Sequence, residues 1–292
     1  MINNYGCQSM VNPIRKILIK HTREGFKSQS ELNNSTSKLN YSETPNFSKS
    51  ISDYDQFVKL LESFNIEIHY LPEDSNTTPD SIYTHDPCIV SNRGVILCSM
   101  GKNDRRSEVP AIESYFNSLN IPILGKIKKP GHLEGGDVVW INERLVAVGE
   151  GYRSNSEGII QLKSILSDLV DNVISVPLPH WTGPLDCLHL MSLLSPIDED
   201  LFLVYSRLLP VPFLRYLSLL EIKLIHVSDD EYDTMGCNVL AIAPRKVIML
   251  EGNPVTKKML EKNNVEVHCY DGSEISLKGA GGPTCLTRPY LR

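Results

Sequence analysis

A glycine-rich turn late in the sequence surrounds a cysteine that could act as a nucleophile. Cys285 closes the segment 279–285, in which three glycines fall within four residues and a proline follows. Such a turn exposes backbone N–H groups, and these donors or a nearby cation stabilise a thiolate. The alternative is a small cysteine that only packs in the core. The glycine setting favours the nucleophile.

The other cysteines lack this setting. The total of seven is odd and no pair has CxxC spacing, so we expect reduced thiols and neither a disulfide framework nor a metal site. Cys7 is uninformative. The remaining five lie in or beside apolar runs, where core packing is the better interpretation: Cys88, Cys98, Cys187, Cys237 and Cys269.

A histidine and a paired-carboxylate motif offer groups for acid–base chemistry. His189 lies between Leu188 and Leu190. A histidine among apolar residues is more often a hydrogen-bonded core group than a catalyst, and both interpretations stay open. The segment 134–137 reads Glu-Gly-Gly-Asp before a β-like run, and its glycines permit the close approach of a ligand or another strand. A turn with two solvated charges is the alternative.

Two aspartates upstream could bind a cation. Asp80 and Asp86 lie six residues apart, so both face the same side if the segment is extended. Carboxylates on one face are costly unless a cation compensates them. A planar guanidinium, with five N–H donors in a fork, would do so. An ordinary exposed loop is the alternative.

The elements that must position these residues repeat along the chain. Five β-like runs each follow a stretch with apolar residues at the i, i+3, i+4 spacing of a helix, such as 54–64 and 159–169. Pro254 suits the first position of the last of these helices. The runs start 55, 52, 49 and 43 residues apart: 66–71, 121–127, 173–178, 222–227 and 265–270.

Paired β-like runs fill the other half of each unit. Four pairs open about fifty residues apart, the third being looser than the rest: 88–98, 138–148, 188–205 and 239–250. A ββαβ unit therefore repeats about five times, and a ring of five blades around a pseudo-five-fold axis would close it. An ordinary α/β sheet with coincidental spacing is the alternative.

The ring hypothesis makes predictions about the site and the domain. Equivalent strand ends meet at one mouth of a ring, so Asp86, Glu134, His189 and Cys285 would converge there. Residues 1–292 would then form a single catalytic domain. Residues 27–50 are rich in Ser and Asn with few apolar residues, which predicts a long loop that could cover the site.

Together these features resemble the guanidino-group-modifying enzymes of the pentein superfamily. That superfamily includes arginine deiminases, dimethylarginine dimethylaminohydrolases and amidinotransferases. The resemblance runs from about residue 12 to residue 292. Each marker is weak alone, but their order and spacing are specific: Leu133-Glu134-Gly135-Gly136-Asp137-Val138, Leu188-His189-Leu190 and Gly281-Gly282-Pro283-Thr284-Cys285-Leu286-Thr287.

The resemblance implies a fold and a set of roles. The fold is a five-bladed α/β propeller, the pentein fold, with the active site on its axis. Cys285 matches the nucleophile, His189 the general acid/base, and Glu134 the carboxylate that pairs with it. Asp80 and Asp86 match the guanidine-binding carboxylates of the dimethylarginine hydrolases. Asp137 and three arginines that would bind the α-carboxylate complete the substrate-binding candidates: Arg105, Arg106 and Arg153.

Two positions depart from the family patterns. Arginine deiminases and amidinotransferases carry an aspartate two residues after the catalytic histidine, where this chain has Met191. Dimethylarginine hydrolases tend to carry a glutamate immediately before the aspartate matched by Asp86, where this chain has His85. The segment 281–292 looks more like that of an arginine deiminase, so the identity of the guanidine stays open.

The implied function is hydrolysis of a guanidine C–N bond of arginine or an Nω-methylated arginine. The products are citrulline plus ammonia or an alkylamine, formed through a covalent Cys285 intermediate without a cofactor or metal. Amidino transfer to an amine is the alternative within the enzyme class. A non-catalytic binding protein with the pentein fold is the alternative from another class.

Composition narrows the range of partners. The formal charge of −6 and the pI of about 5.8 argue against nucleic acid and anionic membranes and suit a small cationic substrate. No apolar run approaches the roughly 18–20 residues of a membrane span. The first residues lack the charged and apolar regions of a secretory signal, so we expect a cytoplasmic protein. The sequence leaves open whether it forms a homo-oligomer.

Overall fold

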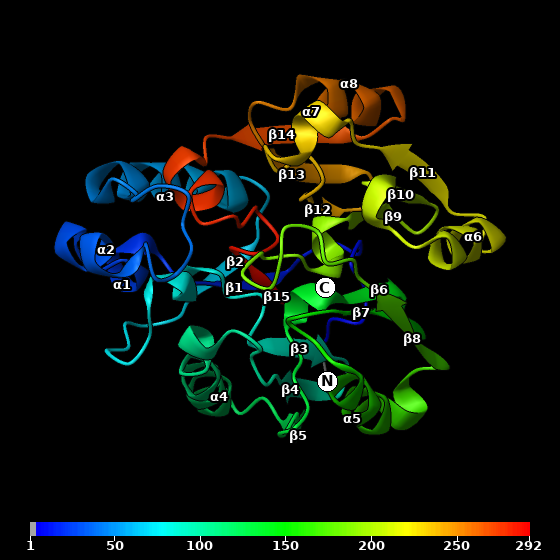
Figure 1. Ribbon diagram of the computed structural model, residues 1–292, viewed down its shortest axis with the longest axis horizontal. Helices are drawn as coiled ribbons and strands as arrows, with labels where there is room; N and C mark the ends of the chain where they lie inside the picture. The colour runs from blue at the N-terminus through cyan, green and yellow to red at the C-terminus, as the bar shows by residue number, and fades with distance from the viewer. Residues whose placement is uncertain (1–3) are drawn as a thin grey trace.

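Five small sheets around one centre form the body of the molecule. A computed structural model describes residues 4–292, and Figure 1 shows these sheets grouped around a common axis with the helices outside. In each sheet an inner strand pairs antiparallel with a middle strand, and the middle strand pairs parallel with an outer one. This is the five-bladed propeller that the repeat predicts.

The strands follow the chain in blade order, except where the ring closes. The first sheet joins both ends of the chain in the order β15–β1–β2. The strands of that sheet are β1 Lys16–Ile19, β2 Glu67–Tyr70 and β15 Arg288–Leu291. The other four sheets are β3 Cys88–Ser91, β4 Gly94–Leu97 and β5 Ile123–Lys126; β6 Val138–Asn142, β7 Leu145–Glu150 and β8 Asn172–Pro177; β9 Leu194–Asp198, β10 Leu201–Val204 and β11 Lys223–His226; and β12 Leu240–Ala243, β13 Lys246–Leu250 and β14 Glu266–Tyr270.

Helices connect the middle strand of each sheet to its outer strand and cover the outside. In α3 the buried side chains include Tyr54, Phe57 and Leu61, at the spacing that places them on one face. Pro254 opens α8, as predicted. No helix within residues 4–292 is both long and apolar enough to cross a lipid bilayer. The helices are α1 Thr22–Gly25, α2 Gln29–Ser35, α3 Phe47–Glu62, α4 Glu108–Ser118, α5 Ser156–Leu166, α6 Val211–Leu219, α7 Asp229–Tyr232 and α8 Pro254–Lys262.

The five β-like runs predicted from the repeat are confirmed. Each predicted run contains the outer strand of one sheet: β2, β5, β8, β11 and β14. The predicted hairpins are also confirmed as β3–β4, β6–β7, β9–β10 and β12–β13. The third hairpin begins at Leu194, six residues after the predicted start, because residues 190–192 form a 3₁₀ turn that carries His189 at its entry.

The predicted long loop over residues 27–50 is wrong in part. Helix α2 begins there because the Ser28 side chain accepts a hydrogen bond from the Glu31 N–H at 3.1 Å, and Leu32 on this helix is fully buried. Helix α3 begins at Phe47, where the Asn46 side chain accepts from the Lys49 N–H. Two local caps and one buried leucine are enough to order a segment whose composition is otherwise that of a loop.

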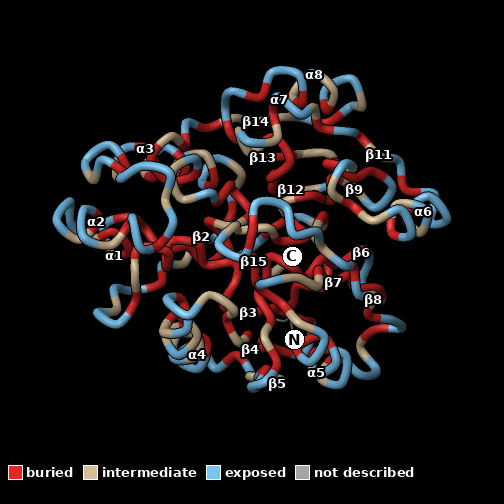
Figure 2. The backbone as a smooth tube through the Cα atoms, viewed as in Figure 1, coloured by how far each residue is buried: buried red, intermediate tan, exposed pale blue. Residues whose placement is uncertain are grey.

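Burial follows the radius of the ring. Figure 2 shows that the backbone nearest the axis is mainly buried, whereas the exposed segments lie on the outer helices and turns. Strands β3, β4 and β10 are buried along their whole length. Such rigid, fully packed inner strands can fix the positions of the residues that precede them.

Candidate active site

Each of the five blades places one polar residue a few positions before its inner strand. Asp86 lies two residues before β3, Glu134 four before β6 and His189 five before β9. Asn238 lies two residues before β12, and Cys285 lies three before β15. Because the inner strands run alongside one axis, these five residues from distant parts of the chain gather at one mouth of the ring.

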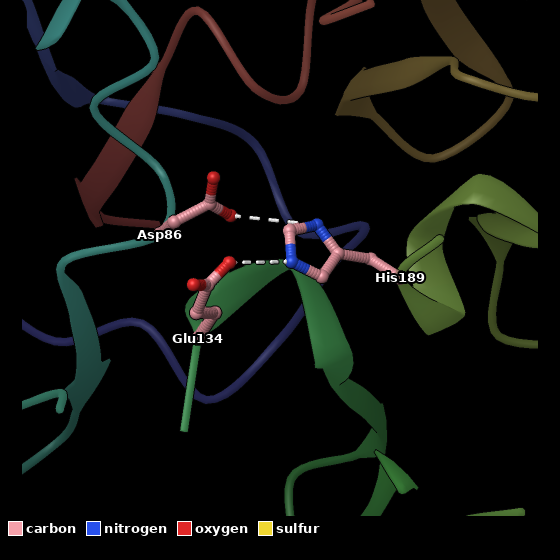
Figure 3. A group of neighbouring side chains, drawn as sticks. All are labelled: Asp86, Glu134 and His189. Carbon is pink, nitrogen blue, oxygen red and sulfur yellow. Dashed lines mark hydrogen bonds and ion pairs between the residues drawn. The ribbon is translucent and has the colours of Figure 1, made fainter. Parts of the chain in front are cut away.

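The centre of the site is an imidazole–carboxylate pair. Nε2 of His189 lies 2.8 Å from Oε2 of Glu134, and Figure 3 shows the two side chains pointing toward one another. Arg153 donates to the same carboxylate oxygen at 2.9 Å, while Oε1 accepts from the Lys102 N–H at 3.0 Å. Burial would raise the pKa of Glu134, but Arg153 and His189 hold it well below its usual range.

His189 carries a positive charge in this environment. Burial would lower its pKa, but the charges of Cys187, Asp86 and Asp137 outweigh burial and raise the pKa well above its usual value. Because Nε2 is engaged by Glu134, Nδ1 is the nitrogen left for proton transfer. A charged imidazole with one free N–H is equipped to act as a general acid.

Asp86 is fixed by contacts on both carboxylate oxygens. Oδ1 accepts from the Gly136 N–H at 2.9 Å and lies 3.9 Å from Nδ1 of His189, as Figure 3 shows. Oδ2 pairs with Arg105 at 2.5 Å. Burial would raise the pKa of Asp86, but Arg105 and His189 lower it, so the group is a carboxylate.

Cys285 lies at the wall of the cavity next to Asn238. The Asn238 side chain donates to Sγ at 3.3 Å and accepts from the Thr284 N–H at 3.2 Å. Desolvation and the charge of Asp86 raise the pKa of the Cys285 thiol to about 12. Ionisation of this thiol therefore needs an added positive charge nearby.

Two hollows meet at Cys285 and Cys187. One is polar, and its lining includes Asp80, Asp86, Lys102, Arg105 and Arg153. The other is more apolar, and its lining includes Trp181, Met191, Tyr232, Met235 and Asn238. A ligand that bridges them would place its charged part among the ion pairs and its reacting atom beside the thiol.

Most of the predicted site residues gather around this cavity. Asp80 lies in the wall with its carboxylate 2.6 Å from Lys102 Nζ. Arg105 and Arg153 are buried in the same wall, and Arg105 also forms a bidentate pair with Glu108. Both arginines already hold protein carboxylates, so they brace the site from behind.

Two predicted substrate-binding residues lie elsewhere. Arg106 is exposed, and its Nε donates to the Met100 carbonyl at 3.4 Å, because the short 3₁₀ turn that buries Arg105 directs the next side chain outward. Asp137 is fully buried outside the cavity lining, where it accepts from Ser154 at 2.6 Å and from the Leu190 N–H at 3.0 Å. It ties the segment that carries His189 to the blade that carries Glu134.

Three residues of the site escaped the sequence analysis. Asn238 could have been found, because the repeat predicts a polar residue before every inner strand. Lys102 gave no local signal. Cys187 was assigned to the core, yet it lines both hollows with Sγ 3.8 Å from His189 Nδ1. Burial would raise the pKa of Cys187, but Arg153 and His189 lower it.

A metal ion has one candidate position within residues 4–292. Ligand atoms of Asp86, Glu134 and His189 lie within 4.8 Å of one another. Both carboxylates, however, are already paired with buried arginines, and His189 is held as a cation. This donor set suits a protonated or guanidinium partner better than a metal ion.

Comparisons with known proteins agree with this geometry. The model of the arginine deiminase family matches residues 75–213 and 209–292. Uncharacterized protein YkgA of Bacillus subtilis is 30% identical over 82% of this chain and 79% of its own length. A dimethylarginine dimethylaminohydrolase of Pseudomonas aeruginosa is 25% identical over 83% of this chain and 89% of its own. The crystal structure of DDAH from Pseudomonas aeruginosa in complex with citrulline shares the fold, with a TM-score of 0.78 at 22% identity, covering 95% of this chain and all of that one.

Proposed function

The chain belongs to the arginine deiminase family of pentein-fold, guanidino-group-modifying enzymes, and from this premise we propose that it hydrolyses a guanidine C–N bond of arginine or an Nω-methylated arginine. The products are citrulline plus ammonia or an alkylamine. One observation carries the proposal: Cys285, the His189–Glu134 pair and Asp86 meet at one cavity from separate blades. An imidazolium beside a carboxylate-rich wall and a thiol suits attack on a cationic carbon.

Substrate recognition rests on the polar hollow. We expect the guanidinium to bind against Asp86 and Asp80, which offer carboxylates to its forked N–H groups. Lys102 now pairs with Asp80 at 2.6 Å and also donates to the Leu39 carbonyl. When the guanidinium reaches Asp80, the ammonium of Lys102 becomes available for the substrate's α-carboxylate. This role replaces the one predicted for Arg106.

Substrate binding would also activate the nucleophile. The pKa of the Cys285 thiol is raised to about 12 by desolvation and by Asp86. A guanidinium held against Asp86 neutralises that carboxylate and adds a positive charge beside Sγ, and both effects favour the thiolate. The thiol therefore loses its proton to solvent when the correct cation binds.

The reaction then runs in two halves with balanced protons. The Cys285 thiolate attacks the amidine carbon, and His189 Nδ1 gives its proton to the departing amine, which leaves an S-alkylthiouronium on Cys285. Neutral His189 next takes a proton from water as the water attacks the same carbon. The C–S bond breaks, releasing the ureido product and the thiolate. Glu134 stabilises the imidazolium in both halves.

Turnover assays test the proposal. The protein should form a ureido product from arginine or from asymmetric dimethylarginine, and Cys285→Ala should lower kcat/KM at least about 10³-fold. Cys269→Ala, in the outer strand β14, is the matched control and should keep full activity. A Cys285→Ala variant with full activity would contradict the mechanism. Product that forms only when a second amine is added would instead indicate amidino transfer.

Thiol labelling separates an enzyme from a binding protein. A cationic haloacetamidine should label Cys285 faster than a neutral haloacetamide of the same size, because Asp80 and Asp86 attract the cation and its charge favours the thiolate. Labelling is read by peptide mass spectrometry, with Cys269 as the internal reference. Equal rates for both reagents would favour a binding role.

A further inference from the structure

A second cavity lies on the propeller axis, on the other side of the residues that form the floor of the active site. The inner strands of several blades line it, together with Arg288 and Arg292 at the closing strand. His85 and Met191 line both this cavity and the active-site hollow, so they form part of the wall between them. We refer to the space between Arg288, Arg292, His85 and Met191 as the axial cavity.

The axial cavity is positively charged. Among residues 4–292, no Asp or Glu lines it, and no carboxylate lies within 4 Å of either guanidinium. Arg292 donates to the carbonyls of Asn12 and Ala241 at 2.5 and 3.0 Å. Backbone carbonyls satisfy N–H groups, but they carry no net charge, so the positive charge of the cavity is not neutralised by the side chains around it.

Arg288 presents a free donor in this space. Its side chain is 6% exposed, and one terminal nitrogen donates to the carbonyl of His85. Its Nε has no hydrogen-bond partner within the described part of the chain. A buried charge without a counter-charge, and a buried donor without an acceptor, are both costly, so this group needs an acceptor that carries negative charge.

His85 supplies a second unpartnered nitrogen. Its Nδ1 lies 2.9 Å from the Thr287 carbonyl, which can only accept, so Nδ1 carries the proton. Nε2 is buried without a partner among residues 4–292. A negative charge beside Arg288 favours protonation of this nitrogen, which then becomes a further N–H donor.

We infer that the axial cavity binds one small monovalent anion of about the size of chloride, held by Arg288 Nε and His85 Nε2. The size of the cavity selects the ligand, because the centre of a water-sized sphere can occupy only about 20 Å³ of it. A monatomic halide fits this space, whereas phosphate or a larger carboxylate does not. The ligand class follows from charge and volume and does not depend on the reaction at Cys285.

The site is coupled to the floor of the active site by packing. A Cβ on Gly135 would lie 2.6 Å from the Arg288 guanidinium and 2.4 Å from the His85 carbonyl. Arg288 therefore packs directly against the segment between Glu134 and Gly136. An anion that holds Arg288 in place would also support that segment.

Bromide provides a direct test, because it scatters anomalously and resembles chloride in size. Crystals of the full chain soaked in sodium bromide should show an anomalous peak in the axial cavity within hydrogen-bond distance of Arg288 Nε. A peak there that has no anomalous signal would identify a water molecule and overturn the inference. Absence of any peak would overturn it equally.

Thermal unfolding provides the test in solution. At constant ionic strength, exchanging gluconate for chloride should raise Tm by about 2–4 °C when chloride exceeds its Kd several-fold. Arg288→Gln should remove this shift. Arg144→Gln is the matched control, because Arg144 is an exposed arginine paired with Asp171, and it should keep the shift. Equal chloride dependence in both variants would overturn the inference, and if Arg288→Gln fails to fold, a wild-type Tm that ignores chloride would do the same.

Discussion

At the scale of single residues, function depends on groups whose ionisation is set by their neighbours. His189 is held as a cation and Glu134 as an anion, although both are buried. The Cys285 thiol is held in its neutral form until a cation arrives. The site is thus arranged to keep a nucleophile inactive toward neutral molecules and to activate it for a guanidinium.

Asn238 should tune that activation. Asn238→Ala removes the 3.3 Å donor to Cys285 Sγ and should lower kcat/KM about 10-fold. Asn238→Asp replaces the donor by a negative charge, so it should raise the thiol pKa further and slow alkylation by iodoacetamide at pH 8 more than Asn238→Ala does. The pH profile of alkylation is the measurement. Identical profiles for the two variants would contradict a direct effect on the thiol.

The ionic centre should make stability depend on pH in acid. The ordinary pKa values of Glu134 and Asp86 are 4.5 and 3.8, and in the folded protein both are lowered despite burial, chiefly by Arg153 and Arg105. The unfolded chain therefore takes up these protons first. The stabilisation is present above these ordinary values and is lost as the pH falls through the lower folded values.

Glu134→Gln should therefore flatten the dependence of the free energy of unfolding on pH between about 5 and 3. Urea unfolding at several pH values is the measurement. Glu157→Gln, at an exposed position of α5, is the matched control and should keep the slope of the wild type. The same slope in Glu134→Gln and wild type would show that Glu134 titrates normally.

At the scale of elements, each blade contributes an entry segment of different shape before a similar inner strand. The entry is two residues long before β3 and β12 but contains a 3₁₀ turn before β6 and β9. These turns bring the backbone of one blade against the side chains of the next. A Cβ on Gly136 would lie 2.4 Å from His189 Nδ1 and 2.8 Å from Asp86 Oδ1.

Gly136→Ala should therefore displace His189 and lower kcat/KM at least about 100-fold. The fold should persist, because the clash is confined to two side chains at the cavity wall. Gly151→Ala is the matched control, since the nearest atom to its added methyl group is 3.4 Å away. Steady-state kinetics and Tm of both variants are the measurements. Wild-type kinetics in Gly136→Ala would mean that the entry segment shifts freely.

At the scale of the whole molecule, the ring is closed by pairing the two ends of the described chain. Strand β15 pairs antiparallel with β1, and the Leu291 backbone also bridges to Gly6. The same closing strand follows Cys285 directly and carries Arg288. Closure of the ring and assembly of the site are therefore one structural event.

Tyr290 should report on this closure. Its ring is 1% exposed and packs edge-on against His69 and Phe116, with centroids 5.4 and 5.8 Å apart. Tyr290→Ala should lower the free energy of unfolding by about 3–5 kcal/mol. Tyr70→Ala, at an exposed tyrosine of the same sheet, should cost far less. Urea unfolding measures both, and equal losses would argue against closure as a main source of stability.

The sequence by itself determined the repeat, because helical and strand periodicities depend on neighbouring residues. It also singled out Cys285, whose glycine-rich turn is a local feature. Only the tertiary structure decided which of Arg105 and Arg106 faces inward, and that Asp137 braces the site from outside the cavity.

Longer-range features were likewise beyond the sequence. The pairing of β1 with β15, the contact of Asn238 with Cys285 and the position of Cys187 beside His189 depend on how blades are placed around the axis. The charge of a buried group depends on desolvation and on partners from other blades, so residue type and spacing could nominate these side chains but could not assign their protonation.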